Sequence, residues 1–186
     1  MPPAPDRDLR TARLWLRPFR EDDVADALAY RNDRRFSQFL PHIPYPFTWS
    51  DAQDFVATNR SDPWERSATF AVVHADRLIG TVTLEIDAPA RSAMLGYAIG
   101  RSWWGRGLAS EAARAVLDWG AVAYGLRRIW ACADARNLAS HRVLQKLGMH
   151  LEQQRSAAHR GRQGELVQEV VYALERPDAV LPAALD

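Results

Sequence analysis

Two glycines enclose an arginine at Gly105 to Gly107, in the stretch WWGRGLASEA, directly before a run that favours a helix. Glycine is costly inside regular structure, so the pair indicates a sharp turn or the close approach of another molecule to the backbone. A helix that begins at such a loop offers unpaired N–H groups and the positive end of its dipole, and both favour phosphate groups. The stretch therefore predicts a phosphate-binding loop, or a tight turn without a ligand. We call residues 104–107 the glycine loop.

A second pair of polar residues, Asn137 and Ser140, begins another predicted helix. Residues three apart lie on one helix face, so this amide and this hydroxyl can act on the same ligand, although Asn137 is also a good helix N-cap. Ser110 and Glu111 fall in the first turn of the helix after the glycine loop. Capping and the helix dipole explain both of them without a role in catalysis.

The common nucleotide and metal motifs fit these residues poorly. A dinucleotide fingerprint needs a third small residue, whose place Ser110 takes, and an acidic residue about 20 positions further on, which only Asp134 approaches. A kinase-type loop needs a Gly-Lys-Ser/Thr ending, which is missing. The five histidines lack metal-ligand spacing with one another or with Cys132. We therefore expect no metal, and we interpret Cys132 as a core residue.

Composition limits the class of protein. The 186 residues suffice for one domain with a good core, and 47% hydrophobic and 25% charged residues are ordinary for a soluble globular protein. The formal charge of +1 does not favour a nucleic acid partner, and the single cysteine excludes an internal disulfide. The sequence begins without the apolar core of a signal peptide, and no apolar run is long enough for a membrane span. We expect a soluble, cytoplasmic protein that binds neither nucleic acid nor membrane.

Hydrophobic periodicity predicts the elements that position these residues. Their order is strand, two helices, three strands, helix, strand, helix and two strands, which favours an α/β domain with a mixed sheet and at least one parallel crossover. The two early helices and the Pro-rich segment between them are candidates for a lid or substrate wall. The predicted strands are 9–19, 68–75, 77–87, 92–100, 127–135, 150–155 and 165–174, with a loop at 156–164, and the predicted helices are 20–33, 52–59, 107–124 and 138–148.

Three motifs occur in order along the chain: TARLWLRPF, WGRGLASEA and NLASHRVLQKLGM. Together they resemble the GNAT superfamily of N-acetyltransferases, in the branch of the ribosomal-protein alanine and serine N-acetyltransferases, and the resemblance runs from Leu9 to Leu174. It implies a single-domain GNAT-like α/β fold with a mixed central sheet of about seven strands flanked by about four helices. The domain would span 9–176, after a frayed N-terminus at 1–8 and before a C-terminal tail at 177–186.

The resemblance implies acetyl-CoA as co-substrate and no metal. The pyrophosphate would lie against the backbone of the glycine loop, and the pantetheine arm would pair with the edge of the strand at 92–100, which this family separates from its neighbour. An amine would attack the acetyl group directly, while a backbone N–H of this strand polarises the carbonyl. The residues placed at the cofactor are Tyr97, Ala98, Ile99, Trp104, Gly105, Arg106, Gly107, Leu108, Ala109, Ser110, Asn137 and Ser140.

Three residues are candidates for the chemistry. The resemblance places Ser140 near the sulfur, where its hydroxyl can stabilise the departing thiolate. Glu85 is the first candidate for the general base, directly or through water, but strand alternation equally allows it to face solvent. Tyr97 is a further donor or a packing residue. An α-amino group has an ordinary pKa near 7.7–8.0 and needs little help to become nucleophilic.

The sequence thus favours an N-acetyltransferase that moves acetyl from acetyl-CoA to a primary amine, and the nearest branch implies a protein N-terminus as the acceptor. A small amine such as an antibiotic, a polyamine or an amino acid is the alternative. Two other classes stay open, a non-catalytic acyl-CoA-binding or sensor module and a nucleotide-binding protein. A homodimer is common among similar proteins and is compatible with either class.

Overall fold

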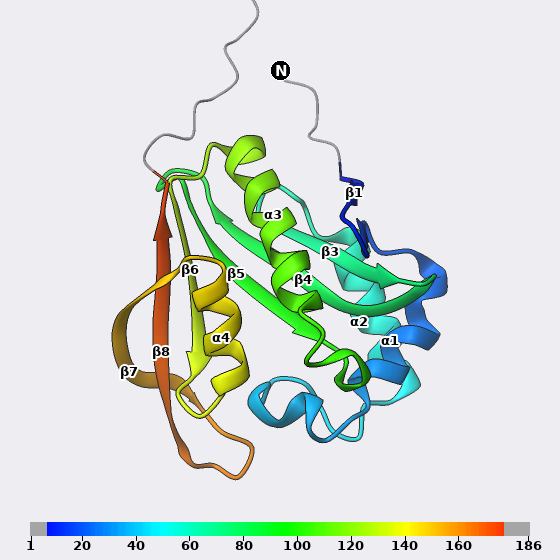
Figure 1. The fold of residues 1–186 in the computed structure, drawn as a ribbon. Helices are drawn as coiled ribbons and strands as arrows, with labels where there is room; N and C mark the ends of the chain where they lie inside the picture. The colour runs from blue at the N-terminus through cyan, green and yellow to red at the C-terminus, as the bar shows by residue number, and fades with distance from the viewer. Residues whose placement is uncertain (1–6, 177–186) are drawn as a thin grey trace, which may run out of the picture.

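An eight-stranded mixed sheet runs through the protein, with helices on both faces (Figure 1). The computed structural model describes residues 7–176, apart from the side chains of residues 157–159. The strand order is β1-β2-β3-β4-β5-β6-β8-β7, which confirms the mixed α/β sheet and gives one strand more than predicted. Residues 1–6 of the predicted N-terminal segment and the whole predicted tail at 177–186 lie outside this description. The strands are β1 (Leu9–Arg10), β2 (Trp15–Arg17), β3 (Ser67–His74), β4 (Arg77–Asp87), β5 (Ser92–Ile99), β6 (Arg128–Asp134), β7 (His150–Arg160) and β8 (Leu166–Glu175).

Four α-helices and three short 3₁₀ turns connect the strands. Helix α2 is capped by Thr48, whose hydroxyl accepts a hydrogen bond from the N–H of Asp51. The Asp51 carboxylate in turn accepts from the backbone N–H of Thr48, which completes a capping box. The helical elements are η1 (Glu21–Asp23), α1 (Val24–Arg31), η2 (Phe36–Phe39), α2 (Trp49–Ser61), η3 (Arg101–Trp103), α3 (Leu108–Tyr124) and α4 (Leu138–Lys146).

The predicted first strand at 9–19 is wrong in one respect, because it is a hairpin of two short strands, β1 and β2. The turn between them is held by Thr11, whose side-chain oxygen accepts from the N–H of Leu14 at 2.9 Å and whose N–H donates to the Leu14 carbonyl at 2.9 Å. No glycine or proline marks this turn, so the alternating pattern continues through it.

The seventh strand is longer than predicted, whereas β8 has the predicted length and is shifted by one residue from 165–174. Strand β7 continues to Arg160, which pairs with Leu166 on β8, so most of the predicted loop at 156–164 belongs to the hairpin. At its tip, the Arg162 guanidinium donates to the carbonyls of Ser37 at 2.9 Å and Leu40 at 3.3 Å. The hairpin tip is therefore tied to η2 and the segment after it, although the two lie far apart in the sequence.

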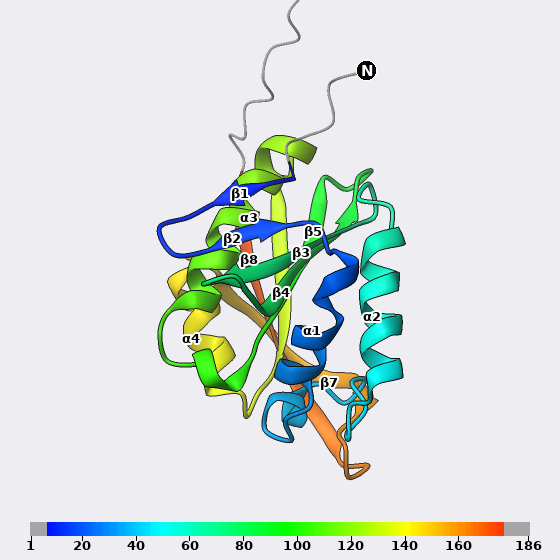
Figure 2. The ribbon, with the colours of Figure 1, turned by 90° about the vertical axis from the view of Figure 1, so that its right-hand side faces the viewer.

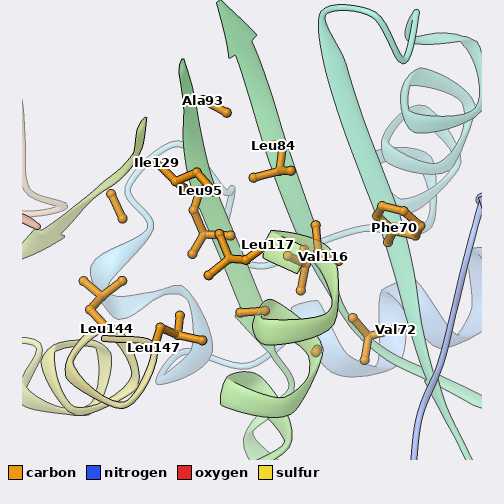
Figure 3. Packing of buried hydrophobic residues seen from close by; sticks show 14 of the residues in the cluster. Phe70, Val72, Leu84, Ala93, Leu95, Val116, Leu117, Ile129, Leu144 and Leu147 are labelled. Carbon is orange, nitrogen blue, oxygen red and sulfur yellow. The ribbon is translucent and has the colours of Figure 1, made fainter. Parts of the chain in front are cut away.

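Two hydrophobic clusters hold the helices to the sheet. Helices α3 and α4 cover one face, and α1 and α2 cover the other (Figure 2). Figure 3 shows the first cluster, in which Leu95 of β5 packs near Leu117 of α3, with Leu144 of α4 beside them. All three side chains are buried, and each such leucine contributes about 1.5–3 kcal/mol of stability. Within the described residues, no helix is long and apolar enough to cross a membrane.

Among the strands of residues 7–176, β5 and β6 are the only neighbours that run parallel, and they pair over three positions, Ser92 to Met94 with Arg128 to Trp130. Beyond this point β5 stays with β4 as far as Ile99, whereas β6 stays with β8 as far as Asp134. The two strands therefore diverge, as Figure 1 shows between β5 and β6. In the part of the chain that the structure describes, one edge of β5 from Leu95 onward has no neighbouring strand.

Candidate active site

A cavity of about 730 Å³, which we call the large cavity, lies beside the diverging strands. Its walls come from the open end of β5, the glycine loop, the first turn of α3, one face of α4 and the segment around η2. The volume and the mixture of aromatic, backbone and hydroxyl groups suit a sizeable organic ligand. The lining residues are Arg35, Phe36, Gln38, Phe39, Leu40, Tyr97, Ala98, Ile99, Trp103, Trp104, Gly105, Gly107, Leu108, Ala109, Ser110, Asn137, Ala139, Ser140, Arg142, Val143 and Lys146.

The glycine loop has the backbone of an anion site. Gly105 and Gly107 have φ of +75° and +77°, a left-handed conformation that other residues rarely adopt. Gly107 is the N-cap of α3 and provides no side-chain cap, which leaves the helix N-terminus open. Among the described residues, the backbone N–H groups of Gly105, Arg106 and Gly107 have no hydrogen-bond acceptor. Three successive free N–H groups at the positive end of a helix dipole are suited to a phosphate.

A hydroxyl pair lies further along the same cavity. The Tyr97 hydroxyl is 2.6 Å from the Ser140 hydroxyl and 3.1 Å from the Ser140 carbonyl, to which it donates. Burial raises the pKa of Tyr97 to about 12, against the opposing effect of the Ser140 hydrogen bond. Tyr97 therefore keeps its proton at neutral pH. The Tyr97 hydroxyl has one proton, and when Tyr97 donates it to the Ser140 hydroxyl oxygen rather than to the carbonyl, the Ser140 proton is free to bond to a third group.

Ser140 is fixed by its own helix. The predicted N-cap role of Asn137 is confirmed, because its side-chain oxygen accepts from the Ser140 N–H at 3.2 Å. The cap begins α4 at Leu138 and places Ser140 in the first turn, facing Tyr97 on β5. Two elements from different parts of the chain thus meet at the open edge of the sheet.

Comparison with known proteins decides the family. A model of the acetyltransferase (GNAT) domain matches residues 13–150. The chain is also 32% identical over 146 residues to the uncharacterized N-acetyltransferase YnaD of Bacillus subtilis (strain 168), over 77% of this chain and 83% of that protein. The chain belongs to the GNAT acetyltransferase family.

Solved structures of GNAT enzymes share the fold. The crystal structure of a GNAT-family acetyltransferase from Bacillus anthracis matches with a TM-score of 0.79 at 26% identity, covering 90% of this chain and 98% of that one. The ribosomal L7/L12 alpha-N-protein acetyltransferase RimL, solved in complex with coenzyme A, matches with a TM-score of 0.75 over 89% of this chain and 95% of that one. At 20% identity the second match shows the fold alone.

The structure brings together most of the residues predicted for this GNAT domain. Eleven of the twelve predicted cofactor residues line the large cavity, and the exception is Arg106. The Arg106 residue is exposed, and its carbonyl accepts a hydrogen bond from Arg13 at 2.9 Å. The edge of β5 is partly occupied at Ile99, whose carbonyl accepts from the Trp104 indole N–H at 2.6 Å. Tyr97 and Ala98 therefore offer the more accessible part of this edge.

Glu85 is not among the residues that line the large cavity. It lies in a second hollow of about 590 Å³, together with Asp62, Arg66, Met94 and Trp130. Glu85 alternates along β4 with Leu84, which belongs to the cluster under α3, so its side chain points to the face that carries α1 and α2. Met94 and Trp130 form the last pair before β5 and β6 diverge. Glu85 therefore lies near the point where the two strands separate, on the face of the sheet that carries α1 and α2.

The prediction for Cys132 needs a correction. The residue is half-buried, and its sulfur accepts a hydrogen bond from Arg155 at 3.4 Å. It alternates on β6 with Ala131 and Ala133, which fill the core, so Cys132 points to the other face. Burial raises the pKa of the thiol, which makes it a poor nucleophile at neutral pH.

Several residues that line the large cavity were not predicted from the sequence. The apolar wall of Phe36, Phe39 and Leu40 lies in a segment that was predicted only as a general substrate wall. On α4, Arg142 and Lys146 line the cavity one turn apart. Their i, i+4 spacing places them on the same face of α4 as Ala139 and Val143, which also line the cavity, and not on the face of Asn137 and Ser140.

Proposed function

We propose that the protein transfers acetyl from acetyl-CoA directly to a primary amine and that the large cavity binds acetyl-CoA. The observation that carries the proposal is the meeting, in one cavity, of the glycine loop, the open edge of β5 and the Tyr97–Ser140 hydroxyl pair. The glycine loop passes a simple fit test, because a Cβ added at Gly105 has no atom within 4 Å and because three of its N–H groups lack acceptors within the described residues. The coenzyme A complex of RimL, which has the same fold, supports this ligand.

In this proposal each part of the cavity has one task. The glycine loop binds the pyrophosphate, and the backbone at Tyr97 and Ala98 pairs with the pantetheine arm. Acetyl-CoA supplies the acetyl group as an activated thioester. Ser140 holds a proton beside the sulfur, and Tyr97 orients Ser140 through their 2.6 Å contact. The enzyme needs no nucleophile of its own, in agreement with the position of Cys132.

For the acceptor we propose the N-terminal amine of a protein. The name of RimL as an alpha-N-protein acetyltransferase supports this choice, and so does the chemistry, because an α-amine is about half unprotonated near pH 8, whereas the amine of a lysine side chain or a polyamine is almost fully protonated there. The experiment is a thiol-release assay with acetyl-CoA and two acceptor sets, short peptides with free N-termini and small amines such as polyamines, amino acids and aminoglycosides. We expect turnover with peptides and none when the peptide N-terminus is blocked. Turnover with the small amines alone would replace the proposed acceptor.

Glu85 provides a specific prediction on proton removal. We propose that it accepts the amine proton through water from its place beside Met94 on the α2 side of the sheet. Glu85→Gln is then expected to lower kcat at pH 7 about tenfold and to leave the Kd of acetyl-CoA unchanged. The deficit should shrink as pH rises toward 9, because the acceptor amine then loses its proton unaided. Asp87→Asn, in the same hollow, is the matched control, and equal turnover of wild type and Glu85→Gln removes Glu85 from the mechanism.

Arg142 and Lys146 provide a prediction on recognition of the adenosine end. Among the described residues, neither side chain forms an ion pair, and both line the large cavity beyond Ser140. We propose that they bind the 3′-phosphate. Arg142→Ala and Lys146→Ala should each weaken acetyl-CoA about fivefold and leave binding of acetyl-dephospho-CoA unchanged, as measured by calorimetry. Arg60→Ala, an exposed position on α2, is the control.

Lys146 is the only lysine of the chain, which allows a second measurement. An amine-reactive acylating reagent should modify Lys146, and coenzyme A should protect it whereas dephospho-CoA should not. Mass spectrometry reads this single site without interference from other lysines. Equal protection by both ligands would show that Lys146 does not contact the 3′-phosphate.

A further inference from the structure

The glycine loop and the first turn of α3 are hydrogen-bonded to the hairpin formed by β1 and β2. The Arg13 guanidinium donates to the carbonyl of Arg106 at 2.9 Å through Nη1. The same group binds the Glu111 carboxylate through Nε at 2.7 Å and Nη2 at 2.6 Å. Glu111 also accepts from the Thr11 hydroxyl at 2.6 Å and from the Arg13 backbone N–H at 3.0 Å. Neither Thr11, Arg13 nor Glu111 lines the large cavity.

These contacts join residues of two sequence motifs, and the proposed chemistry gives these residues no task. Thr11 and Arg13 belong to TARLWLRPF, and Glu111 belongs to WGRGLASEA. Five hydrogen bonds and ion contacts, one to the glycine loop and four to Glu111 in the first turn of α3, are more than a short surface hairpin needs for its own turn. The Thr11 oxygen already serves that turn by accepting from the Leu14 N–H. The remaining contacts therefore act on the glycine loop and the start of α3.

The geometry of one peptide bond shows what Arg13 does to the loop. In a trans peptide the C=O of one residue and the N–H of the next point in opposite directions. Because Arg13 holds the Arg106 carbonyl on the outer side, the N–H of Gly107 points away from Arg13. Gly107 lines the large cavity, whereas Arg13 does not. The free N–H is thus directed to the side where an anion would bind.

Charge gives Arg13 a second effect. A carboxylate in the first turn of α3 places negative charge close to the proposed pyrophosphate site, and like charges repel. The Arg13 guanidinium is in bidentate contact with this carboxylate and offsets it. Burial alone would raise the pKa of Glu111, but the hydrogen bonds from Thr11 and Arg13 outweigh it and lower the pKa, so the carboxylate stays ionised at neutral pH.

We propose that Arg13 is a positioning residue for the glycine loop, which holds the Arg106 carbonyl and the Glu111 carboxylate outside the cavity so that the loop N–H groups are preorganised for the pyrophosphate of the acyl donor. The inference rests on the proposed use of acetyl-CoA. It predicts that Arg13 acts on the part of the donor that carries the pyrophosphate and has no effect on the acetyl-pantetheine part.

The experiment compares Arg13→Met with Arg10→Met, which removes the same charge from an exposed residue of the same hairpin. Calorimetry should show that Arg13→Met weakens acetyl-CoA about tenfold, that Arg13→Lys is intermediate because lysine lacks the planar fork, and that Arg10→Met matches wild type. The kcat/KM for S-acetyl-pantetheine, a donor without pyrophosphate, should stay within about twofold of wild type in all three variants.

Two results would overturn the inference. Unchanged acetyl-CoA binding by Arg13→Met would show that the loop keeps its conformation without this residue. An equal loss with acetyl-CoA and S-acetyl-pantetheine would show that Arg13 only stabilises the fold. A failure of the proposed function looks different, because wild type itself would then fail to bind acetyl-CoA.

Discussion

Replacing Ser140 with alanine is expected to lower kcat about 100-fold while the Kd of acetyl-CoA stays within about twofold of wild type. The hydroxyl lies in the large cavity, 2.6 Å from the Tyr97 hydroxyl, and we propose that it provides a proton to the departing thiolate. Without it, the leaving group departs as a bare thiolate in a partly buried site, which is costly. The acyl donor is still held by the glycine loop and the edge of β5, so binding is preserved.

Tyr97→Phe should have a smaller effect, about tenfold on kcat, because Ser140 keeps its own proton and loses only the group that orients it. With a pKa of about 12, Tyr97 stays protonated below that value, so the wild-type pH profile should show no alkaline decline from Tyr97 up to about pH 11. The thiol-release assay at saturating acceptor measures both variants, and calorimetry measures binding. A larger loss in Tyr97→Phe than in Ser140→Ala would reverse the two roles.

Tyr124→Phe is a matched control for the tyrosine variant. Burial also raises the pKa of Tyr124 to about 12, and its hydroxyl donates to the Trp64 carbonyl at 2.8 Å. This hydrogen bond lies outside the large cavity, so its loss should lower stability by about 1 kcal/mol and leave kcat unchanged. The comparison separates the loss of a buried hydroxyl as such from the loss of the one that contacts Ser140.

The elements that were predictable from sequence are those whose signals are local. The predicted strands at 68–75 and 77–87 match β3 and β4 closely, and the tight turn that joins them is formed by Ala75 and Asp76, which both have positive φ. The hairpin of β1 and β2 was missed because its turn depends on the Thr11 side chain and on Glu111, which is remote in sequence. The extension of β7 was missed because its small and polar residues carry no strand pattern and owe their pairing to β8.

The residues of the site likewise form two groups, those with a local sequence signal and those that only packing brings to the cavity. Glycines and an Asn-x-x-Ser pattern have meaning over a few residues, so the loop and the start of α4 could be located from sequence. Which residues face them depends on packing: the apolar wall around Phe36 reaches the cavity only through the arrangement of η2 against the sheet. Alternation places Glu85 on one of two faces but does not say which, and the face decides whether it meets the large cavity or the second hollow.

Gly105→Ala is expected to weaken acetyl-CoA about 30-fold. Gly105 has φ of +75°, and nothing lies within 4 Å of an added Cβ, so the cause is backbone conformation and not a clash. A residue with a Cβ in this region costs about 1–2 kcal/mol, which the free loop can relieve by moving to negative φ. Binding must then restore the strained conformation, and affinity falls by that cost, about 5- to 30-fold. We expect the upper value because a change of φ at Gly105 also turns the N–H groups of the neighbouring loop residues away from the phosphate.

Gly164→Ala tests whether conformation or position matters. Gly164 has φ of +77° and likewise has nothing within 4 Å of an added Cβ, but it lies in the turn between β7 and β8. Its N–H donates to the Gly161 carbonyl at 3.0 Å and its own carbonyl accepts from Arg160 at 2.8 Å, so this turn resists relaxation. The strain should therefore appear as lost stability, about 1–2 kcal/mol in chemical denaturation, with acetyl-CoA binding unchanged.

The same cost of a positive φ is thus expected to lower the affinity for acetyl-CoA in Gly105→Ala and the stability of the fold in Gly164→Ala. At Gly105 the free protein relaxes, so denaturation should show little change and calorimetry a large one. At Gly164 the free protein cannot relax, so the order is reversed. If Gly105→Ala lost stability and kept its affinity for acetyl-CoA, the loop would be rigid but would not be where the donor binds. The phosphate-binding role of the two glycines would then have no support from their conformation.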